Sequence, residues 1–201
     1  MKTIVFITVI LFLISIKGCS QEYLADRGSL IISGRFNFSV EGSDLFESNS
    51  DRTTSVRFMP AVEYFILPHF FIGERLAYTY SAYKYYTYFH YYSDLKKEFQ
   101  TNSYSTLAIG PTLGYAFGKA DSKAYPYLTS GILFVSSGFN SDNSGRSDSG
   151  KEFIIGGGII FPAKEHLGIL MEAEYHITNL NNGGRDQSSV SLNIGIAGLL
   201  Y

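Results

Sequence analysis

Apolar and polar residues alternate along most of this chain, and the alternation is clearest over residues 167–177. One row of that segment is apolar and consists of Leu167, Ile169, Met171, Ala173, Tyr175 and Ile177. The other row consists of Gly168, Leu170, Glu172, Glu174 and His176. A period of two residues is typical of a β-strand whose two faces meet different environments. The segment therefore predicts a strand with one apolar face and one face that carries two carboxylates.

The same pattern recurs and predicts eight strands. They cover residues 29–40, 54–66, 70–82, 104–117, 125–135, 153–161, 167–177 and 188–201. Their length of roughly ten residues is that of a tilted membrane strand. The connections alternate between long segments, including 83–103 and 136–150, and short ones such as 67–69 and 162–166. No linker or helical repeat interrupts the series, so residues 21–201 are predicted to form one domain.

Period two alone does not show which row points outward. A soluble lipid-carrying barrel keeps its apolar row inside, whereas a membrane barrel turns that row toward lipid. In the strand at 104–117 the second row has small residues from position 106 onward: Thr106, Ala108, Gly110, Thr112, Gly114 and Ala116. Small side chains suit a crowded lumen, and a water-facing exterior would be rich in Lys and Glu. We therefore place the apolar rows in the membrane; the facing of residues 125–135 is ambiguous.

Charged residues of both signs lie on the rows assigned to the lumen. They are Arg35, Arg57, Arg75, Glu63, Glu172 and Glu174. Buried charges need partners, and a narrow eight-stranded barrel brings opposite walls within reach of one another. The sequence therefore predicts a luminal ion-pair network, with a solvated outer face as the alternative. Glu74 interrupts an apolar row, and either a β-bulge or a position at the lipid headgroups would explain it.

Composition supports a membrane protein and disfavours a nucleic-acid binder. Charged residues make up 17% of the chain, against roughly 25% in ordinary soluble domains, and aromatic residues make up 16%, with no Trp. The formal net charge is −2 and no basic stripe is present, so binding through phosphate contacts is not expected.

Residues 1–20 have the pattern of a secretory signal peptide. Lys2 provides the positive start, and residues 4–16 form a largely apolar run too short to span a bilayer as a helix. Gly18 and Ser20 suit cleavage before Gln21. Alternatively, the run that ends at Cys19 is a loose lipobox, which would make Cys19 a lipid-modified N-terminus. Cys19 is the only cysteine, so no internal disulfide is expected.

Several segments resemble the small outer-membrane β-barrels of the OmpA/OmpX type, in particular the porin-like barrel domains of Bacteroidetes-type bacteria. The matching segments are residues 60–65 (PAVEYF), 71–73 (FIG), 156–161 (GGGIIF) and 170–175 (LMEAEY). The resemblance implies an all-β fold, namely an eight-stranded antiparallel up-and-down transmembrane barrel with short periplasmic turns and long extracellular loops. It also implies insertion by the barrel-insertion machinery, which reads a C-terminal aromatic residue. Here Tyr201 falls one place out of register with the outward row, which ends at Leu200.

No motif identifies a catalytic or metal centre. His69, His90, His166 and His176 lack metal-ligand spacing, so we expect no metal and no cofactor. The triple glycine 156–158 lacks the helix and Lys of a phosphate loop, and close strand packing is its expected role. Some outer-membrane barrels modify lipids with a Ser, a His and an acidic residue near the outer rim. His90 and His176 are predicted near that rim, but no motif singles out a nucleophile.

We therefore predict a monomeric, non-enzymatic barrel in the outer membrane of a Gram-negative bacterium. An eight-stranded interior is filled by side chains, so an open pore for solutes is not expected. The predicted role is envelope structure or surface binding, with outer-membrane lipid around the barrel and a surface ligand held by the Tyr-rich residues 83–103. The alternatives are a lipid-modifying enzyme and a soluble, lipocalin-like lipid carrier.

Overall fold

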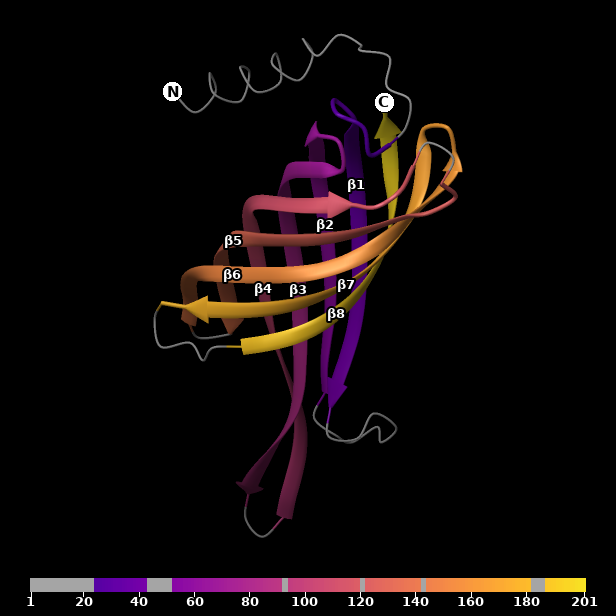
Figure 1. The fold of residues 1–201 in the computed structure, drawn as a ribbon. Coiled ribbons are helices and arrows are strands. Elements are labelled where there is room, and N and C mark those ends of the chain that lie inside the picture. Colours follow the sequence, from indigo (N-terminus) through magenta and orange to yellow (C-terminus); the bar gives the residue numbers. More distant parts are fainter. Residues whose placement is uncertain (1–23, 43–51, 92–93, 120–121, 142–143, 182–186) are drawn as a thin grey trace.

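The computed structural model describes residues 24–42, 52–91, 94–119, 122–141, 144–181 and 187–201, and in these ranges the chain forms one closed β-barrel (Figure 1). The strands are β1 (Leu30–Gly42), β2 (Arg52–Leu67), β3 (Phe70–Tyr91), β4 (Asp94–Ala116), β5 (Tyr125–Ser141), β6 (Ser144–Lys164), β7 (Leu167–Leu180) and β8 (Gln187–Leu200). Each strand pairs antiparallel with the next, and β8 returns to pair with β1. Closure leaves no edge strand, which is the condition for a sheet that spans lipid. The predicted fold class is confirmed.

Two segments predicted as long loops are instead mostly strand. Residues 83–91 and 94–102 continue β3 and β4 as a paired ribbon, and Tyr83 lies opposite Asn102. Residues 136–141 and 144–149 extend β5 and β6 in the same way. The first segment is rich in Tyr, Phe and Thr, which favour strands, but it lacks a clean apolar row and was therefore interpreted as a loop. In Figure 1 the β3–β4 ribbon projects well beyond the rest of the barrel.

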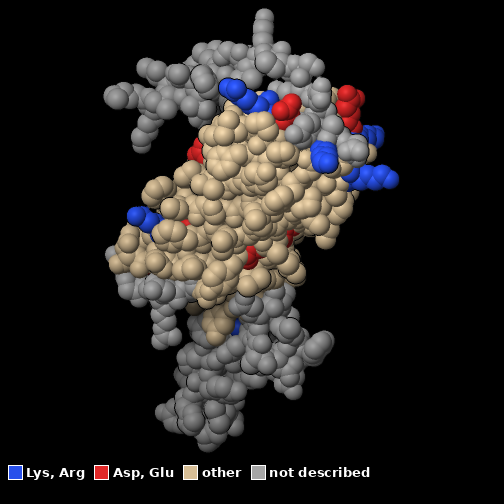
Figure 2. All heavy atoms as spheres, in the orientation of Figure 1, with Lys and Arg blue, Asp and Glu red and all other residues tan. Residues whose placement is uncertain are grey.

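The apolar rows face outward on every strand. Phe36, Phe58, Leu113 and Met171 are 47%, 50%, 49% and 54% exposed. On the face seen in Figure 2, few charged side chains lie across the middle of the barrel, and most of the charge is gathered at the end where the short turns lie. A soluble carrier would bury these side chains in its lumen, so the structure has the arrangement of a membrane barrel.

The structure also resolves two local ambiguities. In β5 the inward row includes Tyr125, Tyr127 and Leu133, while Leu128 and Phe134 are exposed. Glu74 is exposed on the outer face, where its strand pairs regularly with Val62 and Pro111. The only irregularity recorded between β2 and β3 lies between Phe65 and Leu67, so a bulge at Glu74 is not the explanation.

A buried apolar cluster fills the barrel at the end that holds the short turns. Its members come from all around the wall and from the segment before β1: Leu24, Ala25, Ile31, Phe65, Phe71, Ala116, Tyr125, Tyr127, Ile160, Leu170, Ala197 and Leu199. The backbone of the entering segment is held by hydrogen bonds from Gly28 N to Phe65 O (2.8 Å) and from His69 N to Ala25 O (2.7 Å). We call this cluster the apolar plug. Tyr201 packs against it and donates a hydrogen bond to Glu165 O at 2.7 Å.

Candidate functional site in the barrel lumen

Between the apolar plug and the β3–β4 end of the barrel, five charged side chains form a continuous ion-pair chain. Arg35 on β1 contacts Glu63 at 2.6 Å (Nη2–Oε1) and Glu172 at 2.7 Å (Nε–Oε2). Arg75 on β3 contacts Glu172 at 3.3 Å and also pairs with Glu174. All five side chains are at most 3% exposed. The charges alternate in sign, so every buried charge has an oppositely charged neighbour, as burial requires.

Glycines on β6 make room for the two carboxylates of β7. Gly158 and Gly156 are the cross-strand partners of Glu172 and Glu174. A Cβ atom at Gly156 would lie 2.5 Å from Ala173 O and 2.8 Å from Glu174 Cγ. A Cβ atom at Gly158 would meet Met171 O and would lie 2.7 Å from the Tyr127 hydroxyl oxygen. The triple glycine therefore serves close packing around the ion pairs.

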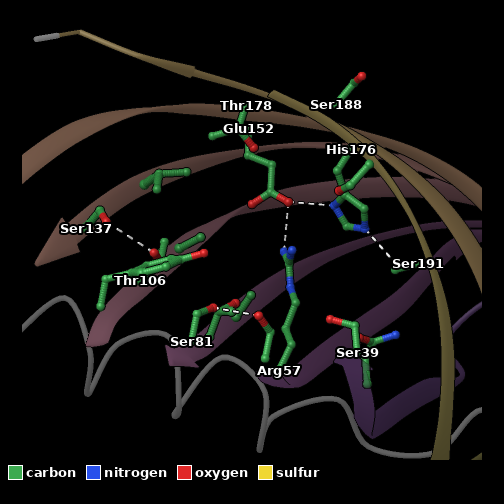
Figure 3. Close-up of a pocket in the computed structure, with 18 of the residues that line it drawn as sticks. Ser39, Arg57, Ser81, Thr106, Ser137, Glu152, His176, Thr178, Ser188 and Ser191 are labelled. Atoms are coloured by element: carbon green, nitrogen blue, oxygen red, sulfur yellow. Dashed lines mark hydrogen bonds and ion pairs between the residues drawn. The ribbon is translucent and has the colours of Figure 1, made fainter. Parts of the chain in front are cut away.

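A second polar cluster lies nearer the β3–β4 ribbon. Glu152 Oε1 is 2.8 Å from Arg57 Nη2 and 2.5 Å from His176 Nδ1. His176 Nε2 is 2.9 Å from Ser191 Oγ and 3.7 Å from Glu174 Oε2. His176 thus links this cluster to the ion-pair chain, and Figure 3 shows Arg57, Glu152, His176 and Ser191 joined in one line of contacts.

This second cluster forms the floor of a cavity of about 640 Å³, which we call the vestibule. Its walls carry many hydroxyl groups, from Ser39, Thr53, Ser55, Thr79, Ser81, Tyr104, Thr106, Ser137, Thr178, Ser188, Ser189 and Ser191. These residues lie toward the end opposite the apolar plug. The plug and the ion-pair chain fill the barrel beneath the vestibule, so it is a blind pocket.

The structure brings all six predicted luminal residues inside the barrel, but it divides them between two clusters. Arg35, Glu63, Arg75, Glu172 and Glu174 are contiguous, whereas Arg57 reaches a different partner, Glu152. Sequence reasoning missed Glu152 because it lies one residue before the predicted start of its strand. The signal was present, since Glu152 continues the inward row that contains Ile154.

Other sequence predictions have mixed outcomes. His176 lies in the lumen, on the same inward row as Glu172 and Glu174, and Asn193, which donates to Glu174 Oε2 at 2.9 Å, was not anticipated. Cys19 lies outside the described residues, as do the side chains of residues 85–100, His90 included. Among the described residues, no group of three or more His, Cys, Asp or Glu could hold a metal ion. The described part of the chain contains no helix long and apolar enough to cross a membrane.

Comparison with solved structures finds proteins of similar fold. The crystal structure of Neisserial surface protein A aligns with a TM-score of 0.51 and 15% identity, covering 85% of this chain and 96% of that one. The N-terminal β-barrel domain of OprF from Pseudomonas aeruginosa aligns with a TM-score of 0.49 and 13% identity, covering 87% of this chain and 98% of that domain. No protein-family model matches the sequence, and no curated protein is significantly similar to it.

Because the identity to Neisserial surface protein A is only 15%, this likeness establishes a shared fold and nothing of a shared activity. Together with the closed antiparallel sheet and its outward apolar rows, it defines the class. The chain is an eight-stranded transmembrane β-barrel with the fold of the small outer-membrane proteins of the OmpA/OmpX type.

Proposed function

We propose that this protein resides in the outer membrane of a Gram-negative bacterium and binds a surface partner through the ribbon formed by β3 and β4. In this proposal the barrel is a monomeric anchor that contacts outer-membrane lipid, and the barrel-insertion machinery places it in the bilayer. Binding at the ribbon requires no chemical step.

The observation that carries the proposal is the length of one hairpin. β3 and β4 have 22 and 23 residues, whereas β1 has 13. The paired ends of β3 and β4 extend past the other strands (Figure 1). Six of the ten residues from 83 to 92 are tyrosines. Tyr offers a large contact area at low entropic cost, and it is favoured in binding surfaces for that reason.

The blind vestibule supports binding over transport. The apolar plug and five buried ion-paired side chains lie between the vestibule and the end with the short turns. A solute would have to displace both layers, and eight-stranded barrels are in general filled by their own side chains. A function at the surface therefore fits this interior better than passive permeation.

Protease accessibility on intact cells tests the proposal. A site for a specific protease is inserted between Tyr91 and Asp94, the last pair of the β3–β4 ribbon, and in a matched variant it is inserted between β4 and β5, directly after Lys119. We expect cleavage of the first variant on intact cells, and cleavage of the second only after the outer membrane is opened. Protection of the ribbon site on intact cells, or recovery of the mature chain in a detergent-free soluble fraction, would contradict the proposal.

The binding role itself is tested by shortening the ribbon. Residues 85–100 are replaced by Asn-Gly, a two-residue hairpin turn, which joins the paired residues Lys84 and Thr101. We expect the shortened barrel to remain folded in the membrane and to lose adhesion of whole cells to surfaces coated with extracellular glycans or proteins. Adhesion equal to that of the full-length chain would count against the ribbon as the binding surface.

A further inference from the structure

The floor of the vestibule has the connectivity of a hydrolytic triad. A carboxylate, an imidazole and a hydroxyl follow one another at 2.5 Å (Glu152 Oε1 to His176 Nδ1) and 2.9 Å (His176 Nε2 to Ser191 Oγ). The three residues come from β6, β7 and β8, which are neighbours in the sheet. Triads are recognised by this geometry and by the roles of the groups, because their order in the sequence differs between folds.

When His176 is neutral, hydrogen-bonding capacity sets which group donates in each of these hydrogen bonds. Glu152 is paired with Arg57 and, as a carboxylate, can only accept a hydrogen bond. His176 therefore donates from Nδ1, and in the neutral imidazole Nε2 must then be the acceptor. The hydroxyl of Ser191 must donate to Nε2. This is the arrangement in which a serine is ready to lose its proton as it attacks.

We propose that Ser191, His176 and Glu152 are the nucleophile, the general base and the orienting carboxylate of an ester hydrolase whose substrate enters the vestibule. Ser191 Oγ attacks the ester carbonyl carbon while its proton moves to His176 Nε2. Collapse of the tetrahedral intermediate breaks the ester C–O bond, and the leaving alcohol takes the proton from His176. Water then gives a proton to His176, attacks the acyl-serine and releases the carboxylic acid, and the same proton returns to Ser191. The net reaction converts an ester and water into an acid and an alcohol.

Asn37 is the group best placed to stabilise the oxyanion. Its side chain lines the vestibule from β1, and its Nδ2 donates to the backbone oxygen of Leu192, the residue after Ser191, at 2.7 Å. An amide nitrogen carries two N–H groups, so Asn37 has a second donor within the cavity that Ser191 also lines. Removing one such donor typically lowers kcat by about 10²–10³.

The lining of the vestibule indicates the substrate class. Its walls are dominated by Ser and Thr hydroxyls, which match the hydroxyl groups of a sugar-like alcohol. The apolar part of the wall is a short strip formed by Ala77, Ala108, Val135 and Leu180, to which Val190 adds one further apolar side chain. This strip suits an acyl group of a few carbons and not a fatty acyl chain. The structure therefore points to short-chain esters on a hydroxylated carrier, such as O-acetylated carbohydrate.

Exposure distinguishes the proposed nucleophile from the buried ion pairs, whereas His176 and Glu152 are themselves only 2% and 4% exposed. Glu172 and Glu174 are buried and form ion pairs with Arg35 and Arg75. Ser191 is half-buried. Its side chain lines the cavity, and its hydroxyl contacts His176 Nε2. This inference departs from the sequence-based expectation of a non-enzymatic chain, because the sequence offered no means of singling out Ser191 among its serines.

The test uses the full mature chain folded in lipid vesicles and a fluorophosphonate probe, whose fluoride leaves when a serine hydroxyl attacks phosphorus. We expect one equivalent of label on the peptide that contains Ser191, and no label after heat denaturation. Ser191→Ala should abolish labelling. Ser136→Ala is the matched control, because Ser136 lies on the exposed face of β5 and does not line the vestibule, and it should label normally.

Turnover of p-nitrophenyl acetate, octanoate and palmitate by the same proteins tests the chemistry and the substrate class. We expect acetate to be preferred, with a loss of roughly 10⁴-fold in kcat for Ser191→Ala or His176→Gln and of about 10²-fold or more for Asn37→Ala. The proposal would be overturned if the folded Ser191→Ala variant were labelled as fully as the unsubstituted chain. It would also be overturned if the unsubstituted chain hydrolysed the esters no faster than that variant. Preference for palmitate would overturn the assignment of the substrate class. Adhesion through the β3–β4 ribbon is measured separately and does not depend on these outcomes.

Discussion

Arg35 on β1 and Glu172 on β7 lie 2.7 Å apart (Nε to Oε2), and each is at most 1% exposed in its side chain. They belong to strands that are separated by β8 on one side of the closed sheet. Their contact therefore links parts of the wall that share no backbone hydrogen bonds. Glu172 also reaches Arg75 on β3, so one carboxylate ties together three strands.

Removal of Glu172 should be among the most damaging single changes in this chain. Glu172→Ala would leave Arg35 and Arg75 adjacent with one partner fewer each, and breaking a buried pair typically costs about 3–5 kcal/mol. Denaturant unfolding in lipid vesicles measures the loss. Arg27→Ala is the control, because Arg27 is exposed and such changes stay within about 0.5 kcal/mol. Equal midpoints for the two variants would contradict a structural role for the network.

Arg57→Ala should cost less than Glu172→Ala. The side chain of Arg57 is 17% exposed at the floor of the vestibule, so water there can solvate the Glu152 carboxylate that the substitution leaves behind. We expect a loss of about 1–3 kcal/mol, the cost of an unsatisfied polar group. The same unfolding measurement checks this order, and a loss as large as that of Glu172→Ala would show that water does not reach Glu152.

The glycines opposite the β7 carboxylates should not tolerate a side chain. In Gly158→Ala the new Cβ atom would collide with the backbone oxygen of Met171, which cannot move without disturbing the sheet. We expect a loss of about 1–3 kcal/mol, as for other overpacked sites. Gly138→Ala is the control, since its nearest neighbour is Ser105 Oγ at 3.9 Å. Similar stability of the two variants would show that the wall near Gly158 is looser than described.

The loss of stability caused by a positive charge on the outward row of β7 should depend on how deep in the bilayer the substituted residue lies. Met171 is next to Glu172 in the chain and lies at the depth of the ion-pair chain, and it is 54% exposed. Met171→Arg should lose about 2–4 kcal/mol in a bilayer, the cost found near the membrane midplane. Asn179→Arg lies on the same row near the end of β7 and should lose at most about 1 kcal/mol. Equal costs for the two variants would mean that Met171 does not face hydrocarbon.

The alternation of residue types predicted the strands and their facing, because lipid and lumen demand different side chains at successive positions. Met171 and Glu172 are neighbours in sequence and lie on opposite faces of the wall, as expected. The six luminal charges were recognised for the same reason. In β5 the pattern was ambiguous because Leu133 and Tyr127 face inward while Ile132 and Leu128 face outward, so both rows are apolar.

The partners of each charge could not be predicted, since they depend on how far each strand is displaced along its neighbours when the barrel closes. Arg57 reaches Glu152 across the lumen, and no local spacing relates these two residues. The contact between His176 and Ser191 has the same origin, because it depends on the register of β7 and β8. The β3–β4 ribbon was missed because its aromatic residues do not separate into two rows.

The account depends most on the opposite environments of successive residues in β7, and spin labelling measures them directly. In a Cys19→Ser background, single cysteines from Leu170 to Ile177 carry a nitroxide in lipid vesicles, and collision with oxygen is compared with collision with a water-soluble nickel complex. We predict high oxygen accessibility at 171, 173, 175 and 177, and low accessibility to both reagents at 170, 172 and 174. High accessibility to the nickel complex at 171, 173 and 175 would show that the apolar row faces water and would contradict a transmembrane barrel.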